Sequence, residues 1–77
     1  MAEKLTFEYD KEGDILYITK LLPYAAQESE EIGDDVIARL NPQTGEVESL
    51  EILFFSTRLG ESGFLDVPVA GELRLTT

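Results

Sequence analysis

The sequence has no cysteine and no histidine, the two residue types that carry much of the nucleophilic and metal chemistry of proteins. Without cysteine, no disulfide can link parts of the chain and no cysteine-based zinc site can form. Without histidine, the usual nucleophile–base pairs and most transition-metal sites are excluded. A serine–lysine pair would remain, but Lys4, Lys11 and Lys20 all stand in surface-like contexts. We therefore expect a protein that is not an enzyme, with no catalytic residues and no cofactor.

Positive charge and long apolar runs are also scarce. Six Lys and Arg residues stand against sixteen Asp and Glu residues, which gives a formal net charge of −10. Such a charge repels phosphate backbones and anionic lipid, so we expect no binding to nucleic acid or membrane, and at most a basic protein partner. No segment approaches the roughly 18 apolar residues of a membrane span, and the first residues show no apolar signal region. A cytoplasmic location is the expectation.

The chain is short, and this limits the core that it can build. A domain of 77 residues buries only about 60–65% of its unfolded surface, so its stability is marginal. The hydrophobic content of 43% is nevertheless sufficient for a globular fold. We expect a single domain over residues 1–77, with a core in 4–59 and a C-terminal extension in 60–77. Small domains without disulfides or metals often gain stability by oligomerising, which favours a homodimer.

Residues 36–55 are predicted to form a central hairpin. Apolar and polar residues alternate on both sides of the turn, and a period of two is typical of a strand. The turn itself is Asn41-Pro42-Gln43-Thr44-Gly45. Proline presets φ at the first corner, asparagine can bond to its own backbone, and Gly45 can take a left-handed φ at the exit.

A first hairpin is predicted over residues 4–19. Leu5, Phe7 and Tyr9 lie on one face of its first strand, and Gly13 is the expected left-handed residue of the turn. Residues 15–18 are apolar on both faces, so we expect a helix, the C-terminal tail or another subunit to cover each face. A second subunit is the interpretation that leads to a homodimer.

The remaining segments carry weaker signals. Residues 26–32 predict either a charged edge strand or a solvated loop, since Pro23 ends regular pairing before them. Residues 55–60 predict a short helical turn with Ser56 as N-cap and Gly60 as its end. Pro68 and the alternation in 72–76 indicate a C-terminal edge strand. The predicted fold is mainly β with one short helix, an antiparallel meander of two or three hairpins.

Five carboxylates within eight residues form the strongest candidate site. Three interpretations stay open: a solvated edge, a docking surface for a basic partner, or a weak Mg²⁺ or Ca²⁺ site. The turn 10–14 superficially resembles a calcium loop, but it lacks the twelve-residue spacing and the closing glutamate. We therefore assign no metal ligand. The possible partner-docking residues are Glu28, Glu30, Glu31, Asp34 and Asp35.

The order of these motifs is similar to that of a known family. Residues 9–18 (YDKEGDILYI), the acidic stretch 28–35, residues 36–38 (VIA) and residues 47–53 (VESLEIL) resemble the bacterial domain of unknown function family 2283. The family pattern is a Tyr-Asp-x-x-x-Asp-x-Leu-Tyr-Ile start and a Gly-Ile-Glu-Ile-Leu close, and this chain has Ser49 where glycine is common. The resemblance covers residues 5–55. It implies a compact, mostly antiparallel sheet with a short helix, no catalytic residues, and an antitoxin-like partnership with a small toxin.

Together these patterns predict a small non-enzymatic β-rich module for binding or assembly, with a basic protein as its partner. The alternative function is weak divalent-cation binding, or a carboxylate-based enzyme, using the acidic residues 28–35.

Overall fold

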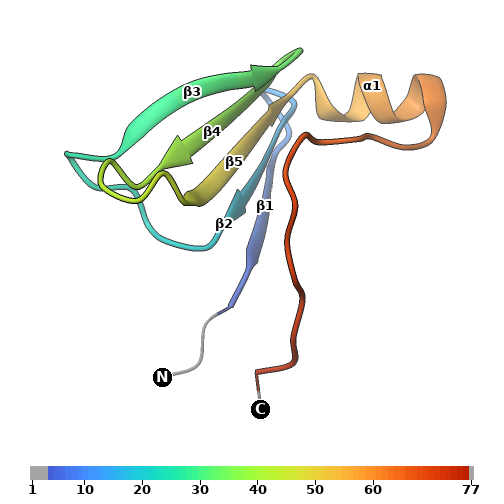
Figure 1. Ribbon diagram of the computed structural model, residues 1–77. Helices are drawn as coiled ribbons and strands as arrows, with labels where there is room; N and C mark the ends of the chain where they lie inside the picture. Colours follow the sequence, from blue (N-terminus) through green and yellow to red (C-terminus); the bar gives the residue numbers. More distant parts are fainter. Residues whose placement is uncertain (1–3, 77) are drawn as a thin grey trace.

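The computed structural model describes residues 4–76, which form a five-stranded sheet followed by one short helix (Figure 1). The elements are β1 (Thr6–Asp10), β2 (Ile15–Thr19), β3 (Glu28–Gly33), β4 (Val36–Leu40), β5 (Val47–Leu53) and α1 (Phe55–Ser62). The strand order is β1-β2-β5-β4-β3, and every neighbouring pair is antiparallel. This confirms the predicted mainly-β fold with one short helix.

Hairpins at both edges of the sheet bring β5 to its centre. β1 and β2 pair directly, and the chain then crosses through residues 20–27 to the opposite edge. From there β3, β4 and β5 follow as a meander, and β5 closes the sheet by pairing with β2. The central hairpin is therefore confirmed. For residues 26–32 the edge-strand interpretation is right, because β3 pairs with β4 and forms an outer edge.

The turn between β4 and β5 forms as the sequence predicts. The Asn41 side-chain oxygen accepts hydrogen bonds from the main-chain N–H groups of Gln43 at 2.8 Å and Thr44 at 3.1 Å. Gly45 donates its own N–H to the Asn41 carbonyl at 2.8 Å, with a left-handed φ of 75°. Glycine takes that conformation without a steric cost, which makes it the favoured residue at position 45 of this turn.

In the β1–β2 turn, the prediction that Gly13 is the left-handed residue is wrong. The positive φ, 55°, belongs to Asp14. Aspartate visits this region more readily than most residues because its short polar side chain can bond locally. Gly13 lies in a tight space, since a Cβ there would lie 3.1 Å from the Asp10 carboxylate and 3.2 Å from the Ile15 side chain, and both side chains would have to shift slightly.

One face of the sheet carries the core. Neighbouring positions on β4 and β5 supply its buried side chains, because Ala38 pairs with Leu50 and Val36 pairs with Ile52. These four residues are surrounded by partly buried apolar side chains from the other strands, from α1 and from the tail, namely Leu16, Ile18, Ile32, Leu40, Val47, Phe55, Leu65 and Val67. We call this the core face of the sheet.

The helix α1 has different ends from those predicted. Phe54, with φ 54°, occupies the N-cap in place of Ser56, and Gly63 ends the helix in place of Gly60. Gly63 has a φ of 81°, and its N–H donates to the Leu59 carbonyl at 2.6 Å. A glycine in this left-handed position is a common helix stop, whereas Gly60 simply continues the helix.

The expected C-terminal edge strand does not form. Residues 64–76, all described, are extended but belong to no strand. Leu65 and Val67 pack against the core, and a Cβ on Gly33 would lie 3.7 Å from the Pro68 ring. Beyond that point the segment turns away from α1 (Figure 1), and Leu73 and Leu75 are almost fully exposed. Pro68 cannot donate to a strand ladder, which removes one pairing bond at the place where the tail meets the sheet.

Candidate functional site

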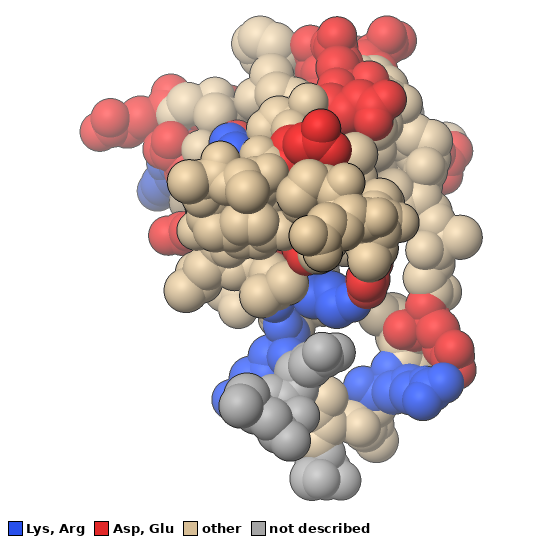
Figure 2. Space-filling view, turned by 60° about the vertical axis from the view of Figure 1, so that its left-hand side comes forward, with Lys and Arg blue, Asp and Glu red and all other residues tan. Residues whose placement is uncertain are grey.

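The acidic residues named by the sequence lie along one edge of the sheet. Glu28 pairs with Leu40 and Glu30 with Ala38, so both glutamates share the side of the core face, while Glu31 lies on the opposite side. Asp34 and Asp35 form the turn into β4. Figure 2 shows acidic side chains gathered at the top of the molecule, the side on which β3 lies in Figure 1. The structure thus places all five carboxylates on one edge strand and its turn.

These carboxylates have no cationic partner among residues 4–76. The ion pairs in this part of the chain lie elsewhere: Lys20 with Glu46, Arg39 with Glu51, and Arg74 with Glu72. Arg58 approaches the turn, but its guanidinium donates to the main-chain carbonyl of Asp34 rather than to a carboxylate. Glu28, Glu30, Glu31 and Asp34 are exposed, and Asp35 is half-buried. The edge therefore presents to solvent several carboxylates that form no ion pair within residues 4–76.

The same geometry gives no support to a cation site. A hard cation such as Ca²⁺ takes six to eight oxygen ligands, so several carboxylates must converge on it. Within residues 4–76 no group of three or more acidic side chains could hold a metal ion. On β3, successive side chains point to opposite faces of the sheet, which separates Glu30 from Glu31.

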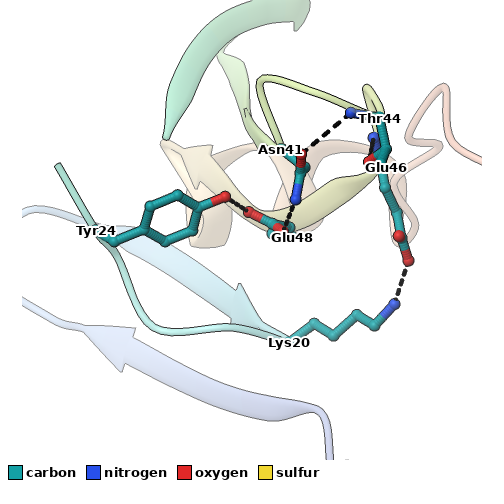
Figure 3. Close-up of polar contacts among 6 residues, drawn as sticks. All are labelled: Lys20, Tyr24, Asn41, Thr44, Glu46 and Glu48. Carbon is teal, nitrogen blue, oxygen red and sulfur yellow. Dashed lines mark hydrogen bonds and ion pairs between the residues drawn. The ribbon is translucent and has the colours of Figure 1, made fainter. Parts of the chain in front are cut away.

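A buried carboxylate that the sequence patterns did not indicate, Glu48, lies near the start of the central strand β5 (Figure 3). Glu48 lies on β5 and is only 4% exposed. One of its oxygens accepts hydrogen bonds from the Tyr24 hydroxyl at 2.5 Å and the Gln27 amide at 3.0 Å, and the other accepts from the Asn41 amide at 3.2 Å. The Tyr24 bond contributes most to lowering the pKa of Glu48, and the same bond raises the pKa of Tyr24 to about 12.

Glu48 fastens the 20–27 crossover to the sheet. Its main-chain carbonyl accepts from the N–H groups of Lys20 at 3.0 Å and Leu21 at 3.1 Å, while its side chain holds Tyr24 and Gln27. The Lys20 ammonium also pairs with Glu46 at 2.5 Å (Figure 3). A buried carboxylate is tolerated only when donors surround it, and these partners supply them. The alternation along β5 could have identified Glu48, because it lies on the same side of the strand as Leu50 and Ile52. An acidic side chain on that buried side needs hydrogen-bond donors around it.

A second missed residue, Asp14, joins the first hairpin to the helix. Its carboxylate accepts from the Tyr9 hydroxyl at 2.6 Å and from the Ser56 N–H at 2.9 Å, and it also contacts Thr57. Its carbonyl accepts from the Phe55 N–H at 3.0 Å. The Tyr9 bond, followed by the Ser56 N–H, lowers the pKa of Asp14 to about 2.

The Asp14 carboxylate thus accepts a hydrogen bond from a main-chain N–H at the start of α1, as an N-cap side chain normally does. Phe54, the N-cap residue, has no side-chain atom that can accept a hydrogen bond. The Tyr9 and Phe55 rings meet edge to face, with centroids 6.0 Å apart, on the same junction. No local pattern pointed to this contact, because Asp14 and Ser56 are far apart in the sequence. Asp14 and Glu48 each hold together segments of the fold that are far apart in the sequence.

One known family matches most of this chain. The model of a family of proteins of unknown function, DUF2283, matches residues 6–56. The chain belongs to this family. The resemblance seen in the sequence is thereby confirmed. No curated protein and no solved structure matches the chain.

The DUF2283 match covers all five strands and the acidic edge, and it ends at the first turn of α1. It therefore contains both Glu48 and Asp14 with their main partners, and it leaves the tail outside. In the part of the chain that the structure describes, no helix is long and apolar enough to cross a membrane.

Proposed function

We propose that this DUF2283 protein is a small non-enzymatic binding and assembly module that docks a basic protein along β3 and forms a homodimer. One observation carries the docking role: five carboxylates lie on an edge strand and its turn, with no cationic partner among residues 4–76. A surface of one charge attracts the opposite charge over long distances and speeds association with it.

The position of β3 adds a second reason. β3 is an outer strand, so its far edge has main-chain N–H and C=O groups that no strand of residues 4–76 pairs. Such an edge can accept an added strand from another polypeptide. Two β3 edges would repel each other, because each brings the same acidic side chains, whereas a segment rich in Lys or Arg would be attracted. The edge thus favours a basic partner over a second copy of itself.

This arrangement fits an antitoxin-like role in the bacterial cytoplasm, in which the module covers a basic surface of a small toxin. The fit follows from the chemistry of the edge: a surface that binds an anionic substrate is basic, and an acidic strand can mask it. Self-association would supply the stability that a short chain without disulfides lacks.

The docking role is tested with the basic proteins encoded beside this chain. Their binding to the purified protein is measured by calorimetry and stopped flow at low and at high salt. The test variant is Glu30→Gln/Asp34→Asn. The control variant, Glu12→Gln/Glu61→Gln, removes the same charge from exposed positions in the β1–β2 turn and in α1.

We expect the test variant to keep its fold and to associate more slowly with the partner at low salt, with the difference fading as salt rises. The association rate of the control variant should change little. Failure of every basic neighbour to bind would remove the proposal. Equal losses in the two variants would show that net charge alone, rather than the β3 edge, attracts the partner.

A further inference from the structure

We infer that two copies of this chain meet through an uncharged strip at β1, formed by Phe7 and Tyr9 of the strand and by Leu5 just before it. The inference rests on the proposed self-association and names the surface that would carry it. The strip lies at the edge of the sheet opposite to β3, so a copy bound there leaves the acidic edge free.

The strip is apolar, exposed and continuous with the core. Phe7 pairs with Ile18 and Tyr9 with Leu16, so the strip lies on the core face of the sheet. Its side chains are 46%, 63% and 42% exposed for Leu5, Phe7 and Tyr9, although their neighbours on β2 are partly buried. Only Tyr9 has a polar end, and its hydroxyl is already bonded to Asp14. Covering the strip would extend the core without leaving a polar group unsatisfied.

The surface area of the chain is large enough to need such a cover. A folded monomer of 8.6 kDa is expected to expose about 4,700 Å². This chain exposes 6014 Å², an excess of about 1,300 Å² over the monomer expectation. The extended segment 64–76 accounts for part of that excess, and the β1 strip for another part. A standard interface covers about 800 Å² on each partner, which is less than this excess.

Electrostatics favours the β1 edge over the β3 edge as the place where two copies meet. Two copies of charge −10 repel each other, and they can approach most closely where both are uncharged. On the core face, β1 and β2 present no charged side chain, whereas β3 presents Glu28 and Glu30. The charged residues of β1, Glu8 and Asp10, lie on the opposite face. A strip of this kind can also be its own partner, as a two-fold interface requires.

A pair of matched variants tests the strip. Phe7→Asp places one charge in the strip, and Leu22→Asp places the same charge on the crossover, where Leu22 is 78% exposed. Both variants raise the net negative charge equally, so any general repulsion between copies is the same. Dimer dissociation constants are measured by analytical ultracentrifugation, and circular dichroism checks the fold. We expect Phe7→Asp to weaken the dimer at least about 30-fold, as loss of a central aromatic contact does, and Leu22→Asp to leave it within a few-fold.

Other outcomes separate this inference from the proposal beneath it. If the unmodified protein is a monomer at micromolar concentrations, both the proposed self-association and the proposed interface at the strip are refuted. If it is a dimer that the two variants weaken equally, self-association stands and the strip is refuted. The double variant Leu73→Asp/Leu75→Asp tests whether the exposed C-terminal segment carries the dimer instead. If only that variant loses the dimer, the strip is not the interface. If Phe7→Asp fails to fold, Leu5→Asp at the half-exposed end of the strip replaces it in the same comparison.

Discussion

Gly45 offers a substitution whose cost can be worked out from backbone geometry alone. Its φ is 75°, and a Cβ built on it would meet nothing within 4 Å. Gly45→Val therefore creates no clash, and its whole cost is the left-handed φ, about 1–2 kcal/mol for a residue with a Cβ. Part of that cost is offset, by about 0.4–1 kcal/mol, because the variant chain has less freedom to lose on folding. We expect a net loss of about 1 kcal/mol, which for a domain of this size lowers the melting temperature by about 4–8 °C.

Two pairs of variants separate the cost of the left-handed φ from other effects of the substitution. Gly45→Asn should cost much less than Gly45→Val, since asparagine tolerates the left-handed region. Gly13→Ala should cost less than Gly45→Ala, because Gly13 is not left-handed and its Cβ would meet only the ends of the flexible Asp10 and Ile15 side chains. Thermal unfolding followed by circular dichroism measures all four. Equal melting temperatures for Gly45→Val and Gly45→Asn would show that φ is not the source of the cost.

Three further predictions follow from the core and from the two missed carboxylates. Ile52→Ala removes a buried side chain at the centre of the sheet and should lower the free energy of unfolding by about 2–5 kcal/mol, measured by urea titration; a loss below about 1 kcal/mol would mean that this core is loosely packed. The pKa of Asp14 is depressed in the folded state, so its contribution to stability is present above its ordinary value of 3.8 and is lost as the pH falls towards about 2. Asp14→Asn should flatten that part of the stability profile, and an unchanged acid limb in urea titrations at stepped pH would contradict the assignment. Glu48→Gln should bring the pKa of Tyr24 down from about 12, because the carboxylate that accepts its hydrogen bond is gone. An ultraviolet titration of the tyrosines measures this, and the Tyr24→Phe variant shows which part of the titration curve belongs to Tyr24. A Tyr24 titration that stays near pH 12 in Glu48→Gln would refute the prediction.

The strands that could be predicted are those specified by short-range patterns. Alternation at a period of two identified β1 and both strands of the central hairpin, an apolar run identified β2, and Asn41 and Gly45 identified the turn between β4 and β5. These signals are local, since a strand's faces and a turn's dihedral angles depend on residues within a few positions of one another. The five acidic residues could be named for the same reason, because their clustering is visible in the sequence itself.

Two of the local predictions chose the wrong residue. Gly60 was predicted to end the helix, but Gly63 takes the left-handed φ. Gly13 was predicted to be the left-handed residue of the β1–β2 turn, but Asp14 takes the positive φ while its carboxylate bonds to the start of α1. That contact of Asp14 joins residues 42 positions apart, which local propensity does not include.

The hairpins, the acidic segment and the lack of histidine and cysteine chemistry can all be read from the residues in order along the chain. That the acidic segment becomes an outer edge depends on β2 and β5 pairing across the chain, which is a property of the folded protein. The same holds for the burial of Glu48 against Tyr24 and for the capping of α1 by Asp14. A buried or capping carboxylate is defined by donors that lie far away in the sequence, and those donors reach it only after the chain has closed its sheet.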